Sequence, residues 1–564
     1  MTTKINFNQI KGSPSNIMDY GAATTASAAT NLAAINAALA ANQSVYVPEG
    51  VFTTTPGIFM NSGNRLYGPG TLKTTVTTSA YTITTATDAT DLVIDGITFD
   101  GPSGVNVFAI TTKGVNGLSV MNCTCKEIKL IDCDVGTGFS QAVAGKTGCN
   151  RNISIINNKG NLTGTSGDGT SSVPCIWVHF CWDFVVEGNV FDGYNDFINV
   201  WGGNWGTDAH AATDPHKAGE GSITGNVGTN CINAGIWTSM AQDVVIGNNF
   251  VSGVAASVEA YDAEASLRIS FENNSSYAFG VSVNLASVNA DIVFTGNTFS
   301  VKDTGVHLRA TNQFDIDGAA PDPTCGSITL RGNTFRVIGA TGCSQFGNGD
   351  YAQIIVDGNT LENVYCWFTH YASAKLGQLI FTNNNIRNSF DNGGVDLQIG
   401  YSTTSIYDVA PFCDHVVSGN VFMSTIGAGT ANIAIQTIQQ NSAMTCLIEN
   451  NKFLNYQNAG TGIGIVSASV QTNFIIRGNT FDADTVYTTN SAPNKIVLWQ
   501  DNYSIACTDA IGASPNSATQ YYSVGSRVWK NAPAAGSEPG WICTTAGLGG
   551  GGTAVFKAMA NLAA

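Results

Sequence analysis

Charged residues are scarce in this sequence, and cations are scarcer than anions. Lys, Arg, Asp and Glu make up 11% of the 564 residues, well below the proportion of about a quarter that is typical of globular domains. The 24 Lys and Arg are outnumbered by 40 Asp and Glu, so the formal net charge is −16 at pH 7. This balance argues against binding nucleic acid or an anionic membrane through a basic face. An acidic polysaccharide would need local basic residues to engage it.

Long apolar runs are absent as well. No run approaches the roughly 18 residues needed to cross a bilayer, so the sequence predicts no membrane span. The N-terminal segment MTTKINFNQIKG has no apolar core like that of a secretory signal peptide. We therefore expect synthesis in a cytosol, with exit by a route other than ordinary secretion if the protein acts outside a cell.

The 14 Cys show no CxxC…CxxC spacing, which removes the common zinc motifs. Cys125 and Cys133 fall in strand-like segments, where Cys behaves as a small buried apolar residue. A chain of this length does not need a disulfide framework, so we predict mostly reduced, structural thiols. We predict no metal and no other cofactor.

Gly, Asn, Thr and Ser take the place of charge, and they occur in a repeat. Residues 241–310 hold three copies of alternating apolar residues, a Gly-Asn-x-Phe or related segment, a turn and a second short strand. The matching residues are Asn248, Asn274 and Asn297. A strand repeat of this length predicts a solenoid.

The same repeat continues over most of the chain. Its Asn position is occupied by Ile97, Cys133, Asn158, Asn189, Asn226, Asn248, Asn274, Asn297, Asn333, Asn359, Asn384, Asn420, Asn451 and Asn479. Asn at a turn adopts left-handed backbone angles and bonds neighbouring backbone groups. We expect an Asn ladder at one corner, with the Phe two positions later stacked inside. The sequence therefore predicts an all-β fold, a right-handed, single-stranded parallel β-helix.

The two ends of the chain differ from the repeat. Leu32, Ile35 and Leu39 recur at helical spacing in residues 30–41. We expect this short helix to cap the open end of the β-helix, whose backbone would otherwise be unpaired. The C-terminal end, richer in Gly, Pro and Trp, predicts a small β module. Its Trp529 and Trp541 are expected in the module's core, with sugar stacking as the alternative.

Three N-terminal motifs carry a family resemblance. DYGA at 19–22, AINAA at 34–38 and VYVPEGVF at 45–52 resemble the opening of the pectate-lyase-like proteins found in phage tailspikes and polygalacturonase relatives. The family's acidic Gly-Asp-Gly…Asp-Asp stretch is replaced here by residues 23–30. The resemblance is close in the cap and extends to the coils only as a pattern. It implies a homotrimer of β-helices on a virion tail that acts on bacterial surface polysaccharide.

These observations divide the chain into four parts. Residues 1–16 are predicted to be a flexible arm that docks into a phage tail or adaptor protein. Residues 17–70 form the cap, and residues 71–509 form the β-helix with a catalytic groove. Residues 510–564 form the C-terminal module, which resembles a module at the ends of phage tail proteins and is expected to cap the helix or to help trimerise it.

Outward-facing residues of one strand per coil predict a sugar-binding groove. Strict alternation places aromatic, amide, acidic and basic side chains outside on successive coils. The residues expected to contact substrate are Trp201, Trp237, Tyr261, Asn284, His307, Arg309 and Asp396. Aromatic rings beside hydrogen-bonding side chains are suited to binding pyranose sugars. For Trp201 and Trp237 the alternative is packing under a loop or against another subunit.

Glu259, Asp262 and Glu264 form the densest acidic cluster. Hydrolysis of a glycosidic bond needs one carboxylic acid and one carboxylate. Glu259 and Asp262 would be about 10 Å apart on an extended strand, and a bend would bring them closer. Crowding would keep one of the carboxyls protonated. The alternatives are a solvated acidic loop or a Ca²⁺ site.

Two further hypotheses depend on the basic residues His307 and Arg309. Arg309 could clamp a sugar carboxylate, and His307 could act as the base of a β-elimination. We favour an endo-acting hydrolase of capsule or O-antigen. A polysaccharide lyase and a receptor-binding spike without activity remain the alternatives. The insert after Trp201, with His210 and His216, is interpreted as a loop beside the groove rather than as a metal site.

Overall fold

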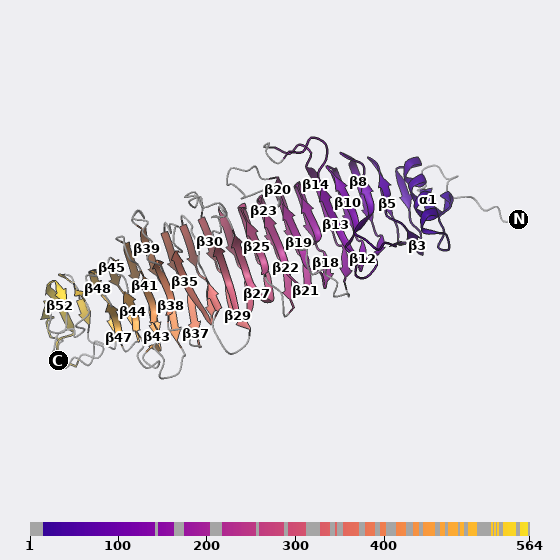
Figure 1. Ribbon diagram of the computed structural model, residues 1–564. Helices are drawn as coiled ribbons and strands as arrows, with labels where there is room; N and C mark the ends of the chain where they lie inside the picture. The colour runs from indigo at the N-terminus through magenta and orange to yellow at the C-terminus, as the bar shows by residue number, and fades with distance from the viewer. Residues whose placement is uncertain are drawn as a thin grey trace. The chain divides into compact units, whose positions relative to one another are not determined.

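The chain is almost entirely β, and its strands pair in parallel from one coil to the next (Figure 1). The description rests on a computed structural model. It covers residues 15–140, 145–162, 174–203, 217–254, 259–286, 291–311, 327–338, 344–346, 353–370, 378–389, 395–401, 413–424, 433–438, 444–456, 463–467, 472–482, 485–489, 495–504, 521–522, 524–525, 527–529, 534–548 and 553–561. Two compact units, Met1–Phe279 and Gly280–Ala564, are described separately.

The N-terminal cap begins at the first residues of the described chain. Strand β1 (Ser15–Asn16) pairs with β2 (Ser44–Tyr46), and a short 3₁₀ turn, η2 (Ile17–Tyr20), follows it. Helix α1 (Ala28–Ala41) starts two residues before the predicted range. Residues 1–14, most of the predicted arm, lie outside the described chain. Within the described residues, no helix is long and apolar enough to cross a membrane.

Local contacts explain why α1 forms and where it packs. The Ser27 side chain caps the helix by accepting a hydrogen bond from the Thr30 backbone N–H. Ile35, Ala38 and Leu39 are buried on the face toward the first coils. The helix lies at the N-terminal end of the first unit (Figure 1). It therefore covers the end of the β-helix, as the sequence predicted.

Each coil of the first unit contributes strands to three sides. The first side consists of β2, β5 (Arg65–Tyr67), β8 (Thr90–Asp95), β11 (Asn116–Met121), β14 (Asn150–Ile156), β17 (Cys181–Glu187), β20 (Ala218–Thr224), β23 (Ala241–Gly247) and β26 (Leu267–Glu272). The second side consists of β3 (Val51–Thr54), β6 (Thr71–Thr74), β9 (Thr98–Asp100), β12 (Thr124–Lys126), β15 (Lys159–Asn161), β18 (Val190–Asp192), β21 (Val227–Cys231), β24 (Phe250–Gly253) and β27 (Ser275–Ala286). The third side consists of β4 (Ile58–Met60), β7 (Ala80–Thr85), β10 (Val107–Lys113), β13 (Lys129–Asp134), β16 (Pro174–His179), β19 (Asp196–Trp201), β22 (Ala234–Ser239) and β25 (Glu259–Glu264).

The second unit repeats this arrangement. Its first side consists of β28 (Ile292–Thr295), β30 (Ser327–Arg331), β33 (Gln353–Asp357), β36 (Gln378–Thr382), β39 (Cys413–Ser418), β42 (Met444–Glu449), β45 (Thr472–Arg477) and β48 (Lys495–Gln500). Its second side consists of β29 (Thr298–Thr311), β31 (Thr334–Ile338), β34 (Thr360–Glu362), β37 (Asn385–Asn388), β40 (Val421–Ser424), β43 (Lys452–Leu454), β46 (Thr480–Phe481) and β49 (Tyr503–Ser504). Its third side consists of β32 (Ser344–Phe346), β35 (Val364–His370), β38 (Val395–Tyr401), β41 (Ile433–Ile438), β44 (Ile463–Ser467) and β47 (Thr485–Thr489).

Parallel pairing on all three sides defines a parallel β-helix and confirms the predicted fold class. Leu118, for example, aligns with Leu92 of the preceding coil and with Ile153 of the next. The C-terminal module is different, because its strands pair antiparallel. It contains β50 (Tyr521–Tyr522), β51 (Arg527–Trp529), β52 (Gly540–Thr545), β53 (Gly547–Leu548) and β54 (Val555–Ala558). Trp541 is buried there, as expected for a core residue.

A ladder of buried Asn side chains joins successive coils at one corner. The side-chain oxygen of Asn226 accepts hydrogen bonds from the backbone N–H (3.0 Å) and the side-chain amide (2.9 Å) of Asn189. The Asn226 amide in turn donates to the Val186 carbonyl and to the Asn249 oxygen, both at 2.9 Å. The members in the first unit are Asn158, Asn189, Asn226, Asn249 and Asn274. Those in the second unit are Asn297, Asn333, Asn359, Asn384, Asn420, Asn451, Asn479 and Asn502.

The predicted Asn ladder is confirmed. Two of its positions were misplaced in the prediction, and one was left out. The ladder member after β23 is Asn249, and Asn248 precedes it with a left-handed backbone (φ 56°). Most other repeats place Gly or Asn at that preceding position, because both residues tolerate this conformation. In consequence Phe250 points outward and Val251 fills the interior. Cys123, not Cys133, holds the early ladder position, since its backbone N–H donates to Asn158, and Asn502 extends the ladder by one coil.

Interior columns pack one side chain per coil. In the second unit the rings of Phe422, Phe453 and Phe481 stack with centroids 5.2 and 4.6 Å apart. In the first unit Cys125 aligns with Phe99 of the preceding coil and is fully buried, as the sequence predicted. The cysteines that the structure describes are all buried thiols.

Neighbouring residues of the ladder provide a stability test. Asn249→Ala removes the acceptor of two buried donors of Asn226, which costs about 1–3 kcal/mol of unfolding free energy. Asn248→Gly keeps a left-handed position at an exposed site, so its effect should stay within about 0.5 kcal/mol. Guanidinium unfolding of both variants measures the difference. Equal stability of the two variants would show that the ladder amides contribute little.

Candidate active site

The third side of the first unit carries the largest group of candidate functional residues. Strands β13, β16, β19, β22 and β25 pair in parallel and in register. One aligned row points into the helix and is fully buried, and it consists of Ile131, Ile176, Ile198, Ile236 and Tyr261. Because side chains alternate along a strand, the residues that follow this row point outward.

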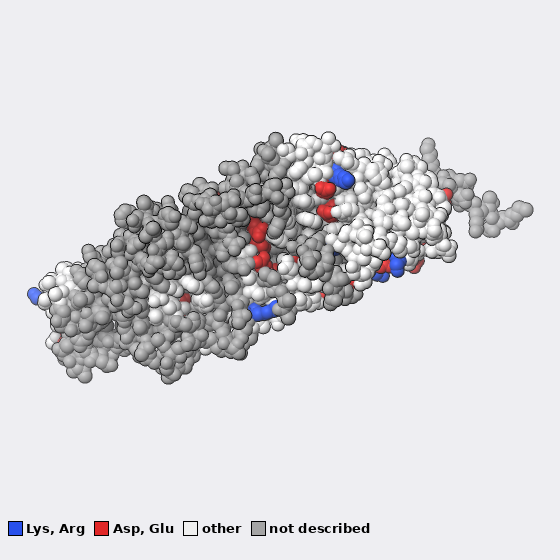
Figure 2. Space-filling model, viewed as in Figure 1, with Lys and Arg blue, Asp and Glu red and all other residues white. Residues whose placement is uncertain are grey.

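Two outward rows result from this register. The first consists of Asp132, Trp177, Asn199, Trp237 and Asp262. The second, two residues further along each strand, consists of His179, Trp201, Ser239 and Glu264. Trp201 and Trp237 thus lie in outward rows, as the alternation predicted, although both are buried, and their contact with substrate stays a prediction. Figure 2 shows acidic atoms gathered over β25.

A bend near the start of the third-side strands places a further row of side chains on the outer face. Ala234 pairs with Glu259 and Ile236 with Tyr261. Ala260, between these pairs, is fully buried next to the fully buried Tyr261, so the alternation of inward and outward side chains is interrupted there. A Cβ on Gly235 would lie 2.3 Å from the Ala260 carbonyl oxygen, so only Gly fits this close approach. Before the bend, Asp196, Ala234 and Glu259 are aligned across β19, β22 and β25.

The bend corrects one predicted site residue and supports another. Straight alternation would place Glu259 and Tyr261 on the same, outer face. Instead Tyr261 is fully buried, and its hydroxyl donates to the carbonyl oxygens of Ser275 (3.0 Å) and Asn249 (3.3 Å). Tyr261 is therefore an interior residue and does not contact substrate. Glu259 lies before the bend and Asp262 after it, so both acids come to the outer side of β25.

Aromatic rings pack closely along the outward rows. The rings of Trp177 and His179 are stacked, with centroids 5.0 Å apart and planes 7° apart. Trp201 lies 6.0 Å from Trp177 and 6.0 Å from Trp237. Trp201 and Trp237 are each only 8% exposed, so little of either ring is open to solvent. Burial also lowers the pKa of His179 to about 3, which keeps its imidazole neutral.

Two buried polar side chains in this region lack a complete set of partners. Asn199 is fully buried, and neither polar atom of its amide has a hydrogen-bond partner among the described residues. Oδ1 of Asp196 accepts from the Asn233 amide (2.8 Å) and the Ala234 N–H (3.1 Å), whereas its Oδ2 is buried without a partner there. An unsatisfied buried polar atom costs about 1–3 kcal/mol. Such atoms are satisfied when a ligand hydroxyl reaches them.

The carboxyl groups of this side have environments that differ from bulk water. Burial raises the pKa of Asp196 to about 6, opposed by its bonds from Asn233 and Ala234 and by the charge of Lys129, and supported by the nearby charge of Glu259. Burial likewise raises the pKa of Asp132 to about 6, against the hydrogen bond of 2.9 Å that the Tyr81 hydroxyl donates. Both groups are therefore partly protonated near neutral pH.

Asp196 and Glu259 have the spacing of a catalytic pair. They lie on β19 and β25, two strands apart, which separates their backbones by about 10 Å. Ala234, the residue between them, has only a methyl side chain. Inverting glycosidases hold their two carboxyls about 6.5–9.5 Å apart. Two carboxyl side chains leaning toward each other over Ala234 can reach that range.

The other predicted site residues belong to the second unit. Asp396 was expected to face outward, but it is fully buried and bonded to Asn388 (2.7 Å) and to the Tyr456 hydroxyl. Asp396 precedes the fully buried Leu397 as Ala260 precedes the fully buried Tyr261, so the same kind of bend directs its side chain inward. Burial raises its pKa to about 6. Asp396 is thus an interior acid rather than a groove residue.

Three further predicted residues cannot be joined to this site. Asn284, in β27, is buried at 4% exposure and belongs to the second unit, so its place in a substrate groove stays a prediction. The side chains of His307 and Arg309 fall outside what the structure describes, as does the insert with His210 and His216. The long groove that would connect these residues to Glu259 stays a prediction. No group of three or more His, Cys, Asp or Glu side chains in the described chain is placed to hold a metal ion.

Sequence reasoning missed Asp132, Trp177, His179 and Asp196. The signal for Trp177 was present, because PCIWVH at 174–179 repeats the Ile-Trp pair of AGIWTS at 234–239. The sequence contained no such signal for Asp196, because straight alternation puts this residue on the same face as the interior Ile198. Only the bend reverses that assignment.

Comparison with known proteins gives similarity to solved structures but no family match. No family model matches the sequence, and no curated protein matches it. Gene product 12 of bacteriophage phi29, in its pre-mature form, is 13% identical, with 93% of this chain and 76% of that chain covered and a TM-score of 0.43. Tailspike protein 3 of bacteriophage CBA120 is 11% identical, with 91% and 66% covered and a TM-score of 0.36. A hyperthermoactive exopolygalacturonase from Thermotoga maritima is 12% identical, with 74% and 91% covered and a TM-score of 0.37.

These structures include a phage tailspike and a polygalacturonase, the two groups that the N-terminal motifs resemble. The identities are too low for any residue to be matched between the chains. The fold assignment made above rests on the strand pairing of this protein itself.

The buried carboxyl of Asp196 predicts a pH-dependent gain in stability on its removal. Its pKa of about 6 in the folded protein lies above the value of about 3.9 in an unfolded chain. The folded state therefore binds the proton more tightly. The protonated Asp196 carboxyl makes its full contribution to folding stability below about pH 4. This contribution falls as the pH rises toward about 6 and is lost above it. Asp196→Asn should stabilise the protein at pH 8 by about 2–3 kcal/mol and leave it unchanged at pH 4, measured by denaturant unfolding. A gain that is the same at both pH values would contradict the assigned pKa.

Proposed function

We propose that this chain is a tailspike-like depolymerase that binds a bacterial surface polysaccharide, capsule or O-antigen, and hydrolyses it within the chain. The observation that supports the proposal is the shared outer face of Asp196, Glu259 and Asp262 with three Trp side chains. Carboxyls supply acid–base chemistry, and indole rings beside amide side chains suit sugar rings and hydroxyls. The N-terminal resemblance adds a virion tail as the location and a tail or adaptor protein as the partner of residues 1–16.

In the proposed mechanism Asp196 is the general acid and Glu259 the general base. Below about pH 6 Asp196 keeps its proton and can give it to the glycosidic oxygen that leaves. Glu259 takes a proton from water as the water oxygen attacks the anomeric carbon. One bond to the anomeric carbon breaks as another forms on the opposite face, so the configuration inverts.

Other acids of β25 provide the alternative assignments. Asp262 lies on the same outer side as Glu259 and was its predicted partner, and Glu264 follows in the next outward row. Asp196 is preferred as the acid because it lies on another strand, which leaves room for a sugar between the two carboxyls. His179 is a weak base, since burial lowers its pKa to about 3, and elimination would need a different base.

The catalytic assignment is tested with isosteric variants on surface polysaccharides from a panel of encapsulated and O-antigen-bearing strains. Glu259→Gln and Asp196→Asn should each slow release of reducing ends at least about a hundredfold, the scale expected for losing a general acid or base. Glu187→Gln, at an exposed position of the first side, is the matched control and should keep full activity. The rate of the unchanged protein should fall as the pH rises above about 6, because Asp196 then loses its proton.

The product distinguishes the three functions. New reducing ends without an unsaturated uronide mark hydrolysis. An unsaturated uronide, seen by its ultraviolet absorbance, would replace the proposal with a lyase. Binding without cleavage of any polysaccharide in the panel would replace it with a receptor-binding spike. Near-full activity of both Glu259→Gln and Asp196→Asn would move the site elsewhere.

A homotrimer is also proposed, and an apolar strip on the second side of the first unit supports it. Val190, Phe250 and Tyr277 lie on β18, β24 and β27 and are 50%, 37% and 49% exposed. Sedimentation at micromolar concentration should give three times the chain mass of 58.8 kDa. Phe250→Asp should weaken the trimer, whereas Phe59→Asp on the exposed face of β4 should not. A monomer of 58.8 kDa would contradict the proposal.

A further inference from the structure

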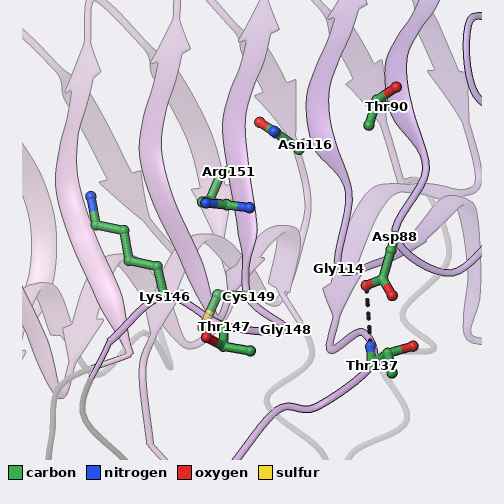
Figure 3. Close-up of a pocket in the computed structure, with 10 residues that line it drawn as sticks. All are labelled: Asp88, Thr90, Gly114, Asn116, Thr137, Lys146, Thr147, Gly148, Cys149 and Arg151. Carbon is green, nitrogen blue, oxygen red and sulfur yellow. Dashed lines mark hydrogen bonds between the residues drawn. The ribbon is translucent and has the colours of Figure 1, made fainter.

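A cavity lies on the first side of the first unit, away from the carboxyls of the third side. Its volume is about 480 Å³, within the range of about 300–1,000 Å³ of pockets that hold small molecules. The residues important for its chemistry are Asp88, Thr90, Asn116, Lys146, Thr147 and Arg151 (Figure 3). They come from β8, β11 and β14, from the turn before β8, and from the loop that leads into β14.

The floor of this cavity is an aligned row of three polar side chains. Thr90, Asn116 and Arg151 occupy the same register position on β8, β11 and β14. Successive members are about 4.8 Å apart, so the row extends about 10 Å. It presents a hydroxyl, an amide and a guanidinium in one line. The spacing is similar to the distance between substituents across one sugar ring.

The wall of the cavity is held in place by close backbone packing. Oδ1 of Asp88 accepts a hydrogen bond of 3.1 Å from the backbone N–H of Thr137. A Cβ on Gly114 or Gly136 would lie 2.7 or 2.2 Å from the same oxygen, so both positions require Gly. This contact fixes the loop against β8 and β11. The cavity is thus formed by packed structure.

The charges of the cavity are distributed unequally. The ammonium group of Lys146 is already bonded to Glu220 (2.6 Å) and Asp183 (3.3 Å) and lies over the ring of Trp182. Arg151 is exposed and has no ion-pair partner within the described part of the chain. By contrast, Arg65 and Arg268 on the same side pair with Asp95 and Asp243. Arg151 is therefore a cation available to an external anion.

We propose that this cavity binds a carboxylate-bearing sugar residue, that is, a uronic acid unit of an acidic polysaccharide. The planar fork of an Arg matches a carboxylate with two parallel hydrogen bonds. Thr90, Asn116 and Thr147 can bond ring hydroxyls, and the second oxygen of Asp88 can accept one. The carboxylate of Asp88 disfavours a dianion such as a phosphate monoester. A chain of net charge −16 repels an acidic polymer, so a local cation is needed to hold it.

This inference goes beyond the proposed function, since the cavity contains none of the residues assigned to hydrolysis. It names a separate binding site and specifies acidic units in the polymer. Saturation-transfer difference NMR on the full chain can compare methyl glucuronide with methyl glucoside. The uronide should bind at least about tenfold more tightly, because only it pairs with Arg151.

Variants locate the binding and separate it from catalysis. Arg151→Gln should reduce uronide binding to the level of the glucoside. Arg65→Gln removes the same charge from an Arg that is already paired on the same side, and should leave uronide binding unchanged. Glu259→Gln should also leave it unchanged, even where it abolishes cleavage.

Three results would overturn the inference. They are equal binding of the two glycosides, uronide binding that survives Arg151→Gln, and the absence of uronide binding to the unchanged protein. None of them bears on the catalytic role of Glu259, which is read from cleavage of the polymer. Likewise, loss of the hydrolysis proposal would leave uronide binding at Arg151 to be judged by itself.

Discussion

The hydrogen-bonded stacking of Asn amides at one corner is the interaction on which the rest of the structure depends. A buried amide must use both its donor and its acceptor, because each group left unsatisfied is costly. Asn226 meets this demand by bonding Asn189 on one side and Asn249 on the other, together with the backbone carbonyl of Val186. Each coil is thereby held at the spacing and register of its neighbour. Residues far apart in sequence then form straight rows on the outer sides.

The bend of the third-side strands decides which rows of side chains lie on the outer face. It allows Glu259 and Asp262, three positions apart, to share the outer face, and it brings Asp196 beside them. The same arrangement buries Asp196 and raises its pKa to about 6. A buried acid with an unsatisfied oxygen costs stability. Natural sites accept such costs where a group must be held in a reactive state.

The few cations of the chain are used sparingly. Arg65, Arg268 and Arg477 pair with acids on the helix surface, where such pairs contribute little to stability but leave no local positive charge. Arg151 is arranged differently, in a cavity with polar groups on either side. In a protein of net charge −16 one exposed cation changes the local potential more than it would in a balanced surface.

The sequence by itself determined the parallel β-helix, its capping helix, the Asn ladder and the outward positions of Trp201 and Trp237. The helix follows from its own apolar spacing, and the other features follow from a local period that repeats along the coils. It did not determine Tyr261 and Asp396, which straight alternation placed outside and the structure buries. It also could not show Asp196 as part of the site. The reason is the bend at the corner of each coil, which reverses alternation at one residue. Its position depends on close packing between neighbouring coils, as at Gly235, and is therefore a property of the tertiary structure.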